Sequence, residues 1–309
     1  MMRCLILVLL GLAVPLSAAP RPLPFRLVET GQGYARLADA VAAIGTGTGT
    51  ILIAPGVYRE CAVQQAGAII YRAQEPGRVV LDGVACEGKA GLVLRGRAAA
   101  IDGLVFRNFR VADRNGAGIR LERGDLQVTN SSFRQSEQGI LTHDDRHATL
   151  RIERSTFSGL GGCPNGLCSH SIYAGNYGQV IVRRCRFEQG TGGHYVKSRS
   201  ARIEVTDSSF DDSHGRATNY MIDLPAGATG LIAGNHFVQG PDKENYSAFI
   251  AIGAEQRLHS AVGLRIAGNR AAFAPGVRRT SSFIANWTRD PIRITDNQLG
   301  PGLRPYAAR

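Results

Sequence analysis

The segment HYVKSR at residues 194–199 gathers four types of side chain that take part in acid–base and ionic chemistry. In an extended strand, successive side chains point to opposite faces, and lysine and arginine avoid the protein interior. Val196 should therefore point inward. Tyr195, Lys197 and Arg199 should then point outward in one row, where they could act together.

Two neighbouring segments, SIYAG at 171–175 and MIDL at 221–224, follow the same burial pattern. Their aliphatic residues should point inward, which turns Tyr173 and Asp223 outward. If the three segments stack in parallel, one outer face carries Tyr173, Lys197 and Asp223 on consecutive coils. Four further polar residues are expected beside this row, namely Arg199, His170, His194 and Asn219.

A cation, a phenol and amides on one sheet face suit β-elimination from a uronic-acid polysaccharide. The cation or amide neutralises the substrate carboxylate and acidifies the C5 proton, a base removes that proton, and an acid protonates the leaving oxygen. We assign Lys197 or Arg199 as neutraliser or base, and Tyr173 or His194 as proton carrier. An adjacent Asp223 would keep Lys197 protonated, which favours the electrostatic role for this lysine.

The remaining candidates would bind substrate. His170, Asn219 and Asp223 lie close to the row, and Glu244 and Asn245 of KENYS (243–247) could form a groove wall. The alternative interpretation is a lysine–aspartate pair on an exposed sheet, a common arrangement that contributes little to stability.

No metal or other cofactor is predicted. CPNGLC at 163–168 lacks further histidine or cysteine at the spacing of a zinc site. Calcium stays open but lacks a clear acidic cluster, because HDD at 143–145 and Asp211-Asp212 both stand where turns are expected.

A short phrase that repeats seven times between residues 126 and 299 must build the strands that position these residues. It runs apolar, any, apolar, any, any, small polar, any, then usually Phe. The copies are LQVTNSSF, LRIERSTF, VIVRRCRF, IEVTDSSF, GLIAGNHF, LRIAGNRA and IRITDNQL, and their last positions are 24, 30, 23, 27, 34 and 28 residues apart. Such a period is typical of a solenoid in which each unit is one coil.

Within each copy the apolar residues alternate, as in Leu150 and Ile152, which predicts a strand with one buried face. Leucine-rich repeats share this period, but their dense LxxLxL signature is missing. Small polar residues recur two positions before the end of each copy, where stacked side chains can hydrogen-bond from coil to coil. They are Ser131, Ser155, Cys185, Ser208, Asn235, Asn269 and Asn297, so we interpret Cys185 as a buried free thiol.

On this phrase and its polar ladder, the chain resembles the pectate-lyase-like superfamily over roughly residues 45–305. The resemblance implies an all-β fold, a right-handed single-stranded parallel β-helix, and a carbohydrate ligand. GYARLADAVAAIGTGTGTILIAPGVY resembles the helix, turn and strand that open such proteins, with Leu37, Val41 and Ile44 on one helical face. The superfamily includes lyases, hydrolases, epimerases and adhesins, and the motifs that distinguish its named enzyme families are missing here.

The N-terminus predicts export. Residues 1–19 contain Arg3, an apolar run and small residues near Ser17–Ala19, as in a secretory signal peptide, and no later segment is apolar enough to cross a bilayer. In a secreted or periplasmic protein, Cys163 can pair with Cys168 and Cys61 with Cys86. Residues 20–309 are expected to form one monomeric domain.

The formal net charge of +11 falls to +10 (36 − 1 − 25) without the leader, which permits an acidic polymer as ligand. No run of Lys and Arg supports nucleic acid. The leading hypothesis is therefore an exported lyase that acts on an acidic polysaccharide. The alternatives are a hydrolase or uronate epimerase on the same fold, or a non-catalytic glycan-binding or envelope structural protein.

Overall fold

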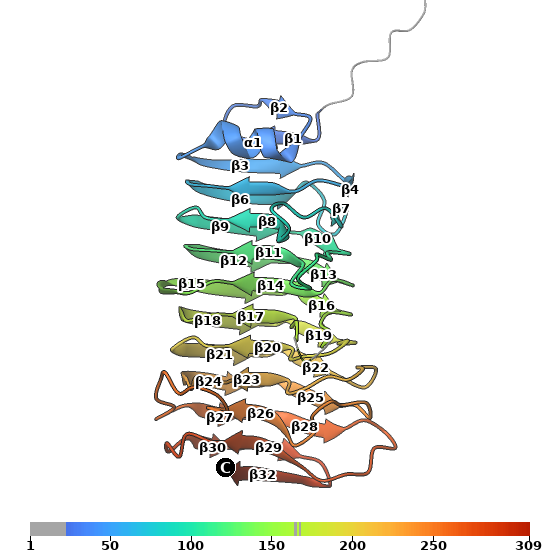
Figure 1. Cartoon of the computed structure of the whole chain (residues 1–309), viewed down its shortest axis with the longest axis vertical. Coiled ribbons are helices and arrows are strands. Elements are labelled where there is room, and N and C mark those ends of the chain that lie inside the picture. The colour runs from blue at the N-terminus through green and yellow to red at the C-terminus, as the bar shows by residue number, and fades with distance from the viewer. Residues whose placement is uncertain (1–22, 164–165, 167) are drawn as a thin grey trace, which may run out of the picture.

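A computed structural model describes residues 23–163, 166 and 168–309, in which the chain winds into a stack of coils (Figure 1). The coils follow one another in sequence order from one end of the stack to the other and contribute strands to three sheets, which are parallel except for two antiparallel pairings at the N-terminal end of one sheet. The fold is a right-handed parallel β-helix, as the repeated phrase and the resemblance to the pectate-lyase-like superfamily together imply. The expected signal peptide at residues 1–19 lies outside the described residues.

Sheet 1 has twelve strands. In spatial order they are β2 (Gly33–Tyr34), β1 (Phe25–Leu27), β3 (Thr48–Ile53), β6 (Ala68–Ala73), β9 (Ala98–Asp102), β12 (Asp125–Thr129), β15 (Asp145–Glu153), β18 (Tyr177–Arg183), β21 (Arg202–Thr206), β24 (Thr229–Ala233), β27 (Arg265–Ala267) and β30 (Arg293–Thr295).

Sheets 2 and 3 have ten strands each. Sheet 2 consists of β4 (Gly56–Tyr58), β7 (Val79–Asp82), β10 (Leu104–Arg107), β13 (Ser132–Arg134), β16 (Thr156–Ser158), β19 (Arg186–Glu188), β22 (Ser209–Asp211), β25 (His236–Gln239), β28 (Arg270–Phe273) and β31 (Gln298–Leu299). Sheet 3 consists of β5 (Ala62–Gln64), β8 (Ala90–Leu94), β11 (Ala117–Leu121), β14 (Gln138–Thr142), β17 (Ile172–Ala174), β20 (Val196–Ser198), β23 (Ile222–Leu224), β26 (Ala248–Ile252), β29 (Ser281–Asn286) and β32 (Leu303–Ala308).

The repeated phrase spans a strand of sheet 1, a two-residue corner and a strand of sheet 2. In the first copy the corner is Asn130 and Ser131, between β12 and β13. Asn130 adopts a φ of 50°, and the equivalent Arg154 and Asp207 have φ values of 47° and 52°. This left-handed conformation is tolerated by asparagine and aspartate, whereas an arginine pays about 1–2 kcal/mol for it. The corner is therefore imposed by the stacking and not by local preference alone.

The second corner residue forms the predicted polar ladder. Asn269 Oδ1 accepts hydrogen bonds from Asn235 N and Asn235 Nδ2, each at 3.0 Å, while Asn269 Nδ2 donates to Ile232 O at 3.0 Å. Cys185 belongs to this ladder, because its backbone N–H donates to Ser208 Oγ at 3.0 Å. Its thiol is free and buried, and burial raises the thiol pKa to about 12. The interpretation of Cys185 as a structural residue is confirmed.

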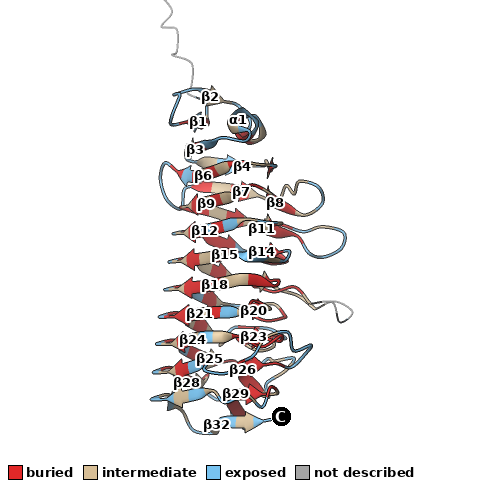
Figure 2. Ribbon diagram, turned by 90° about the vertical axis from the view of Figure 1, so that its left-hand side faces the viewer, coloured by how far each residue is buried: buried red, intermediate tan, exposed pale blue. Residues whose placement is uncertain are grey.

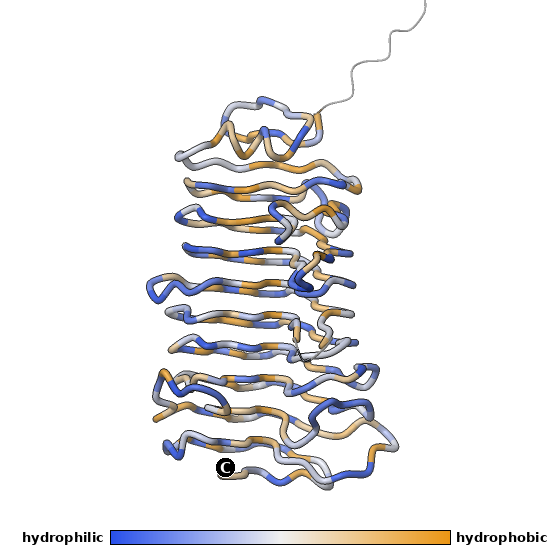
Figure 3. The backbone as a smooth tube through the Cα atoms, viewed as in Figure 1, coloured by the Kyte–Doolittle hydropathy of each residue, from blue (hydrophilic) through white to orange (hydrophobic). Residues whose placement is uncertain are grey.

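Aromatic rings stack along the core behind the ladder. The rings of Phe106, Phe133, Phe157, Phe187, Phe210 and Phe237 lie with neighbouring centroids 4.7–4.9 Å apart. This distance equals the spacing of hydrogen-bonded strands, so the rings stack because their strands pair. Buried positions alternate with more exposed ones along the strands (Figure 2), and hydrophilic residues gather at the turns on the edges of the stack (Figure 3).

The helix α1 (Leu37–Ile44) covers the N-terminal end of the stack (Figure 1). Leu37, Ala40 and Val41 are buried, and Glu60 accepts a hydrogen bond from Leu37 N at 2.7 Å. A carboxylate at this end of a helix is favourable because the helix dipole is positive there. The predicted capping helix is confirmed.

The two predicted disulfides, Cys61–Cys86 and Cys163–Cys168, are both formed. Among the described residues, no helix is long and apolar enough to span a membrane.

Asn269→Ala should lower the free energy of unfolding by about 2–3 kcal/mol, because it leaves the buried Asn235 amide without its acceptor. The urea midpoint measures this loss. Asn269→Ser should cost less, since serine fills the same ladder position in other coils. Gln127→Ala on β12 serves as control, because this side chain is exposed and makes no hydrogen bond among the described residues, and an equal, small effect of all three substitutions would contradict a stabilising ladder.

Candidate functional site

The predicted row of side chains is present on the outer face of sheet 3. Tyr173 of β17 pairs with Lys197 of β20, which pairs with Asp223 of β23. Their neighbours Val196 and Ile222 are fully buried, as expected for the inward positions. The predicted register is therefore confirmed, and it brings a phenol, an ammonium group and a carboxyl group together on three successive coils.

Tyr195 corrects the sequence prediction, because it points inward and is only 2% exposed. The strand begins at Val196, so the alternation of faces does not extend back to Tyr195. The Tyr195 hydroxyl donates to Asp212 Oδ1 at 2.7 Å, and Asp212 Oδ2 lies 3.0 Å from Lys243 Nζ. Asp212 was expected in a turn, and its side chain is fully buried in this ion pair.

The outer row is itself covered, which the sequence did not indicate. Lys197 is 8% exposed and Asp223 is 3% exposed. The loop after β26 returns toward these coils, anchored by hydrogen bonds from Gly253 N to Leu224 O and from Glu255 N to Pro225 O. Its last part is held by His259 Nε2, which lies 3.0 Å from Asn176 Oδ1. Sheet 3 therefore carries a partly closed site.

Glu255 of this loop bridges the two cations of the predicted site. Lys197 Nζ donates to Glu255 Oε1 at 2.6 Å, and the Arg199 guanidinium pairs with Glu255 Oε2. Arg199 Nε donates to the Tyr173 hydroxyl at 3.0 Å, and Lys197 Nζ lies 3.4 Å from Asp223 Oδ2. The five side chains form one connected cluster, which we call the carboxylate site.

Burial and neighbouring charges shift the pKa values of three members of the carboxylate site, Lys197, Glu255 and Asp223. Burial alone would lower the pKa of Lys197, but Asp223 and Glu255 outweigh it, and the pKa is raised. Lys197 is thus a cation at neutral pH. Burial raises the pKa of Glu255, but Lys197 and Arg199 reverse this effect, and its pKa is lowered. Burial raises the pKa of Asp223 to about 6, against the opposing effect of Lys197.

Two predicted histidines lie beside the carboxylate site and are neutral. Burial lowers the pKa of His170 to about 3, and burial together with His170 lowers the pKa of His194 well below its ordinary value. The rings of His170 and His194 stack at 4.9 Å, and His194 stacks on Tyr220 at 5.6 Å. His194 Nε2 lies 3.4 Å from Asp223 Oδ2.

The hydrogen bond from His194 N to His170 Nδ1, at 3.0 Å, fixes the tautomer of His170. Because Nδ1 accepts, the ring proton must be on Nε2. Both histidines are thus packed as neutral parts of a ring column.

Of the three remaining predicted residues, Asn219 and Glu244 contact each other and Asn245 stands apart. Asn219 Nδ2 donates to the Glu244 carboxylate, and Asn219 Oδ1 accepts from Tyr220 N at 2.8 Å. Asn245 instead turns back to its own loop and accepts from Ser247 N at 3.0 Å. The structure therefore brings Asn219 and Glu244 together, while no hydrogen bond within the described residues joins Asn245 to the carboxylate site.

Glu255 is the member of the carboxylate site that sequence analysis missed. It is 58 residues from Lys197 along the chain and lies in a loop that carries no repeat. In the sequence, only the charge of Glu255 and its position outside the repeated phrase could have indicated a role, and many solvated residues share both properties.

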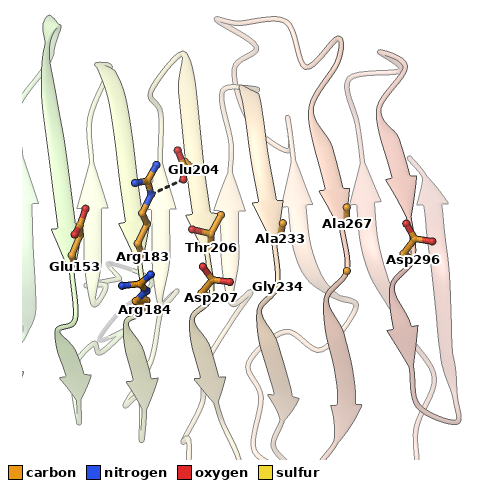
Figure 4. A pocket seen from close by; sticks show the side chains of 11 residues that line it. Glu153, Arg183, Arg184, Glu204, Thr206, Asp207, Ala233, Gly234, Ala267 and Asp296 are labelled. Carbon is orange, nitrogen blue, oxygen red and sulfur yellow. Dashed lines mark hydrogen bonds and ion pairs between the residues drawn. The ribbon is translucent and has the colours of Figure 1, made fainter.

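A groove on the corner between sheets 1 and 2 contains none of the predicted residues (Figure 4). Its side chains include Glu153, Arg183 and Asp207, and Arg183 Nε donates to Glu204 Oε1 at 2.6 Å. The charged groups there are partly exposed, so they are screened by solvent. Within the described part of the chain, no three His, Cys, Asp or Glu side chains are grouped so that they could hold a metal ion.

Comparison with known proteins identifies the fold. No family model and no curated protein matches the chain. The chain resembles ORF18 of Geobacillus virus E2 with 11% identity and a TM-score of 0.51, over 88% of its own length and 57% of the viral chain. It resembles a pectin methylesterase from Aspergillus niger with 12% identity and a TM-score of 0.50, over 94% and 91% of the two chains. At these identities, the likeness shows the parallel β-helix alone.

The contribution of the buried Asp223 to the free energy of unfolding should fall as pH rises. Its folded pKa of about 6 exceeds the ordinary 3.8, so the folded protein retains a proton that the unfolded chain has released. This contribution is complete below about pH 4 and lost as pH rises through about 6. As pH rises through this window, the urea midpoint of the wild type should fall relative to that of Asp223→Asn. The difference should correspond to up to about 3 kcal/mol of unfolding free energy.

The exposed Asp207→Asn serves as the matched control, and its midpoint should run parallel to the wild type across this window. Parallel curves for Asp223→Asn as well would show that Asp223 titrates normally.

Proposed function

We propose that this protein is a polysaccharide lyase that cleaves an acidic, uronate-containing polysaccharide by β-elimination. The observation that carries this proposal is Glu255, a carboxylate held by Lys197 and Arg199 while Arg199 also contacts the Tyr173 hydroxyl. The site already binds one carboxylate beside a phenol. A uronate carboxylate in the place of Glu255 would bring a sugar ring against Tyr173.

Lys197 and Arg199 neutralise the carboxylate of the substrate. Both are cations at neutral pH, and two cations on one carboxylate stabilise the charge that develops when the neighbouring C5 proton leaves. Asp223 lies 3.4 Å from Lys197 Nζ and keeps this ammonium group charged and oriented. Lys197 is therefore assigned the electrostatic role and not the role of base.

Tyr173 is the proton carrier. Its hydroxyl accepts a hydrogen bond from Arg199 Nε at 3.0 Å, and this contact fixes the position of the phenolic oxygen beside the two cations. The phenolate oxygen takes the C5 proton, the electron pair of the C5–H bond forms the C4–C5 double bond, and the C4–O bond breaks. The proton on Tyr173 then passes to the leaving oxygen. His194, which is buried and neutral, orients Asp223 and the ring column.

Three alternatives differ from the lyase in what they require of these residues. A uronate epimerase shares proton removal from C5 but returns a proton to the opposite face of the sugar. A glycoside hydrolase needs two carboxyl groups that act on the scissile bond, whereas Asp223 is buried against Lys197 and the substrate carboxylate takes the place of Glu255. A non-catalytic glycan-binding protein would bind the uronate without turnover. Proton removal from C5 is therefore the step best supported.

We also propose that residues 20–309 form a single domain and that this domain is exported from the cytosol. The two disulfides support an oxidising compartment, outside the cytosol. The pectin methylesterase that shares the fold is named for pectin, and the choice of an acidic polysaccharide for this protein rests on Lys197 and Arg199.

Tyr173→Phe and Lys197→Met should each lower turnover at least about 100-fold. Tyr173→Phe removes the proton carrier, and Lys197→Met removes one of the two cations that bind the substrate carboxylate. Turnover is measured as the ultraviolet absorbance of unsaturated products from alginate, polygalacturonate and other uronate polymers. Tyr34→Phe and Lys89→Met, which change the same residue types near the N-terminal end, should leave turnover unchanged.

Two results would replace the lyase with an alternative. Exchange of deuterium from solvent into C5 without chain cleavage would indicate an epimerase. Binding of a uronate polymer by the wild type with neither exchange nor cleavage would indicate a non-catalytic protein.

Glu255→Gln should lower KM by up to about tenfold, since a neutral amide competes less well than a carboxylate for Lys197 and Arg199. Steady-state kinetics on the best uronate polymer measure this change. Glu188→Gln removes a carboxylate that pairs with Arg186 on sheet 2 and should leave KM unchanged. A higher KM for Glu255→Gln would show that Glu255 helps to bind substrate and does not compete with it.

A further inference from the structure

The loops that lead into sheet 3 have the carboxylate site on one side and a second groove on the other. Five consecutive strands of sheet 2, from β10 to β22, end along it. Its volume is about 870 Å³, compared with about 620 Å³ for the groove of Figure 4. Thr191 lines this groove, whereas His194 of the same loop lies beside the carboxylate site. The loops thus separate two distinct surfaces.

The charged residues that line the groove are all basic. Arg110, Arg134 and Arg216 line it, and none of its lining residues is an aspartate or glutamate. In the described part of the chain no ion pair involves these three arginines, whereas Arg107 and Arg183 each pair with a carboxylate. Three guanidinium groups therefore face the groove without a protein counter-charge, which favours an anionic ligand.

The spacing of the polar groups fits an extended polymer. Arg110 and Arg134 come from neighbouring coils, and Arg216 follows β22, three coils beyond β13. At about 4.8 Å per strand, the groove extends roughly 19 Å along the stack. Gln135 and Gln189 lie between these ends and can hydrogen-bond hydroxyl groups. Cations at the ends with amides between them suit a chain that bears both carboxylates and hydroxyls.

The absence of stacking platforms distinguishes the ligand from a nucleic acid. Single-stranded nucleic acids bind to grooves in which aromatic side chains stack on the bases. Among the described lining residues the only ring is that of His214. The charge alone would attract either polymer, but the hydroxyl-binding amides and the lack of aromatic side chains favour a sugar.

We propose that this arginine groove is a non-catalytic binding site for an acidic polysaccharide, separate from the carboxylate site on sheet 3. The identity of the polymer rests on the proposed function, whereas the groove itself does not. Two sites on one rigid stack raise the affinity for a long chain that reaches both, and a short oligosaccharide gains nothing.

The test compares polymer binding in two triple variants with equal loss of charge. One replaces Arg110, Arg134 and Arg216 with Ala. The other replaces Arg202, Arg265 and Arg293, which are exposed on sheet 1. Both carry Tyr173→Phe to slow cleavage, and affinity electrophoresis with polygalacturonate and polymannuronate measures binding at fixed salt. Thermal unfolding confirms that both variants fold.

The groove variant should bind the polymers roughly tenfold to a hundredfold more weakly than the sheet 1 variant, as expected for three lost charge contacts. With Tyr173 restored, its turnover of a uronate trisaccharide should equal that of the wild type. Equal weakening in both triple variants would show only an effect of net charge and overturn the proposal. Tighter groove-dependent binding of single-stranded DNA than of either polymer would overturn the assignment to a sugar.

Binding is measured independently of cleavage, so the two proposals can fail separately. A wild type that forms no unsaturated product would overturn the lyase, while groove-dependent polymer binding would still stand.

Discussion

The constraint on which the whole structure depends is the parallel pairing of each strand with its equivalent one coil away. Equivalent side chains then repeat at one strand spacing, whatever their chemistry. In the core this produces the stack from Phe106 to Phe237, and at the corner it produces the ladder that ends in Asn297. On the outer face of sheet 3 the same spacing brings Tyr173, Lys197 and Asp223 together. One geometric rule thus serves both stability and the candidate site.

Burial gives these polar residues their particular properties. A charge removed from water must be paired, and Lys197 is paired on two sides, by Asp223 and by Glu255. The inner partner is fixed by the sheet, whereas the outer partner belongs to a loop and is 43% exposed in its side chain. An exposed partner can be exchanged for another carboxylate at lower cost than a buried one. This asymmetry is why the outer side of Lys197 is the side on which a ligand is expected.

The fold and the outer row were predictable from the sequence because both depend on local rules. Alternation of buried and exposed residues places Ile172 and Val196 inside, and the period of the phrase aligns successive coils. Tyr195 escaped the same rule because it precedes its strand, and its partner Asp212 comes from a loop. Glu255 was not predictable, since its contact with Lys197 depends on the path of an irregular loop and not on the repeat.

The stack also has a consequence for how such a protein can change over evolution. Each coil contacts mainly its two neighbours, so a whole coil can be duplicated or deleted far from β17, β20 and β23 without altering their mutual register. The length of the solenoid, and with it the reach of its surfaces along a polymer, can therefore vary independently of the chemistry. The unit that must stay together is the group of four adjacent coils from β17 to β26, because the loop after β26 supplies Glu255, and the other coils act as a scaffold of adjustable length.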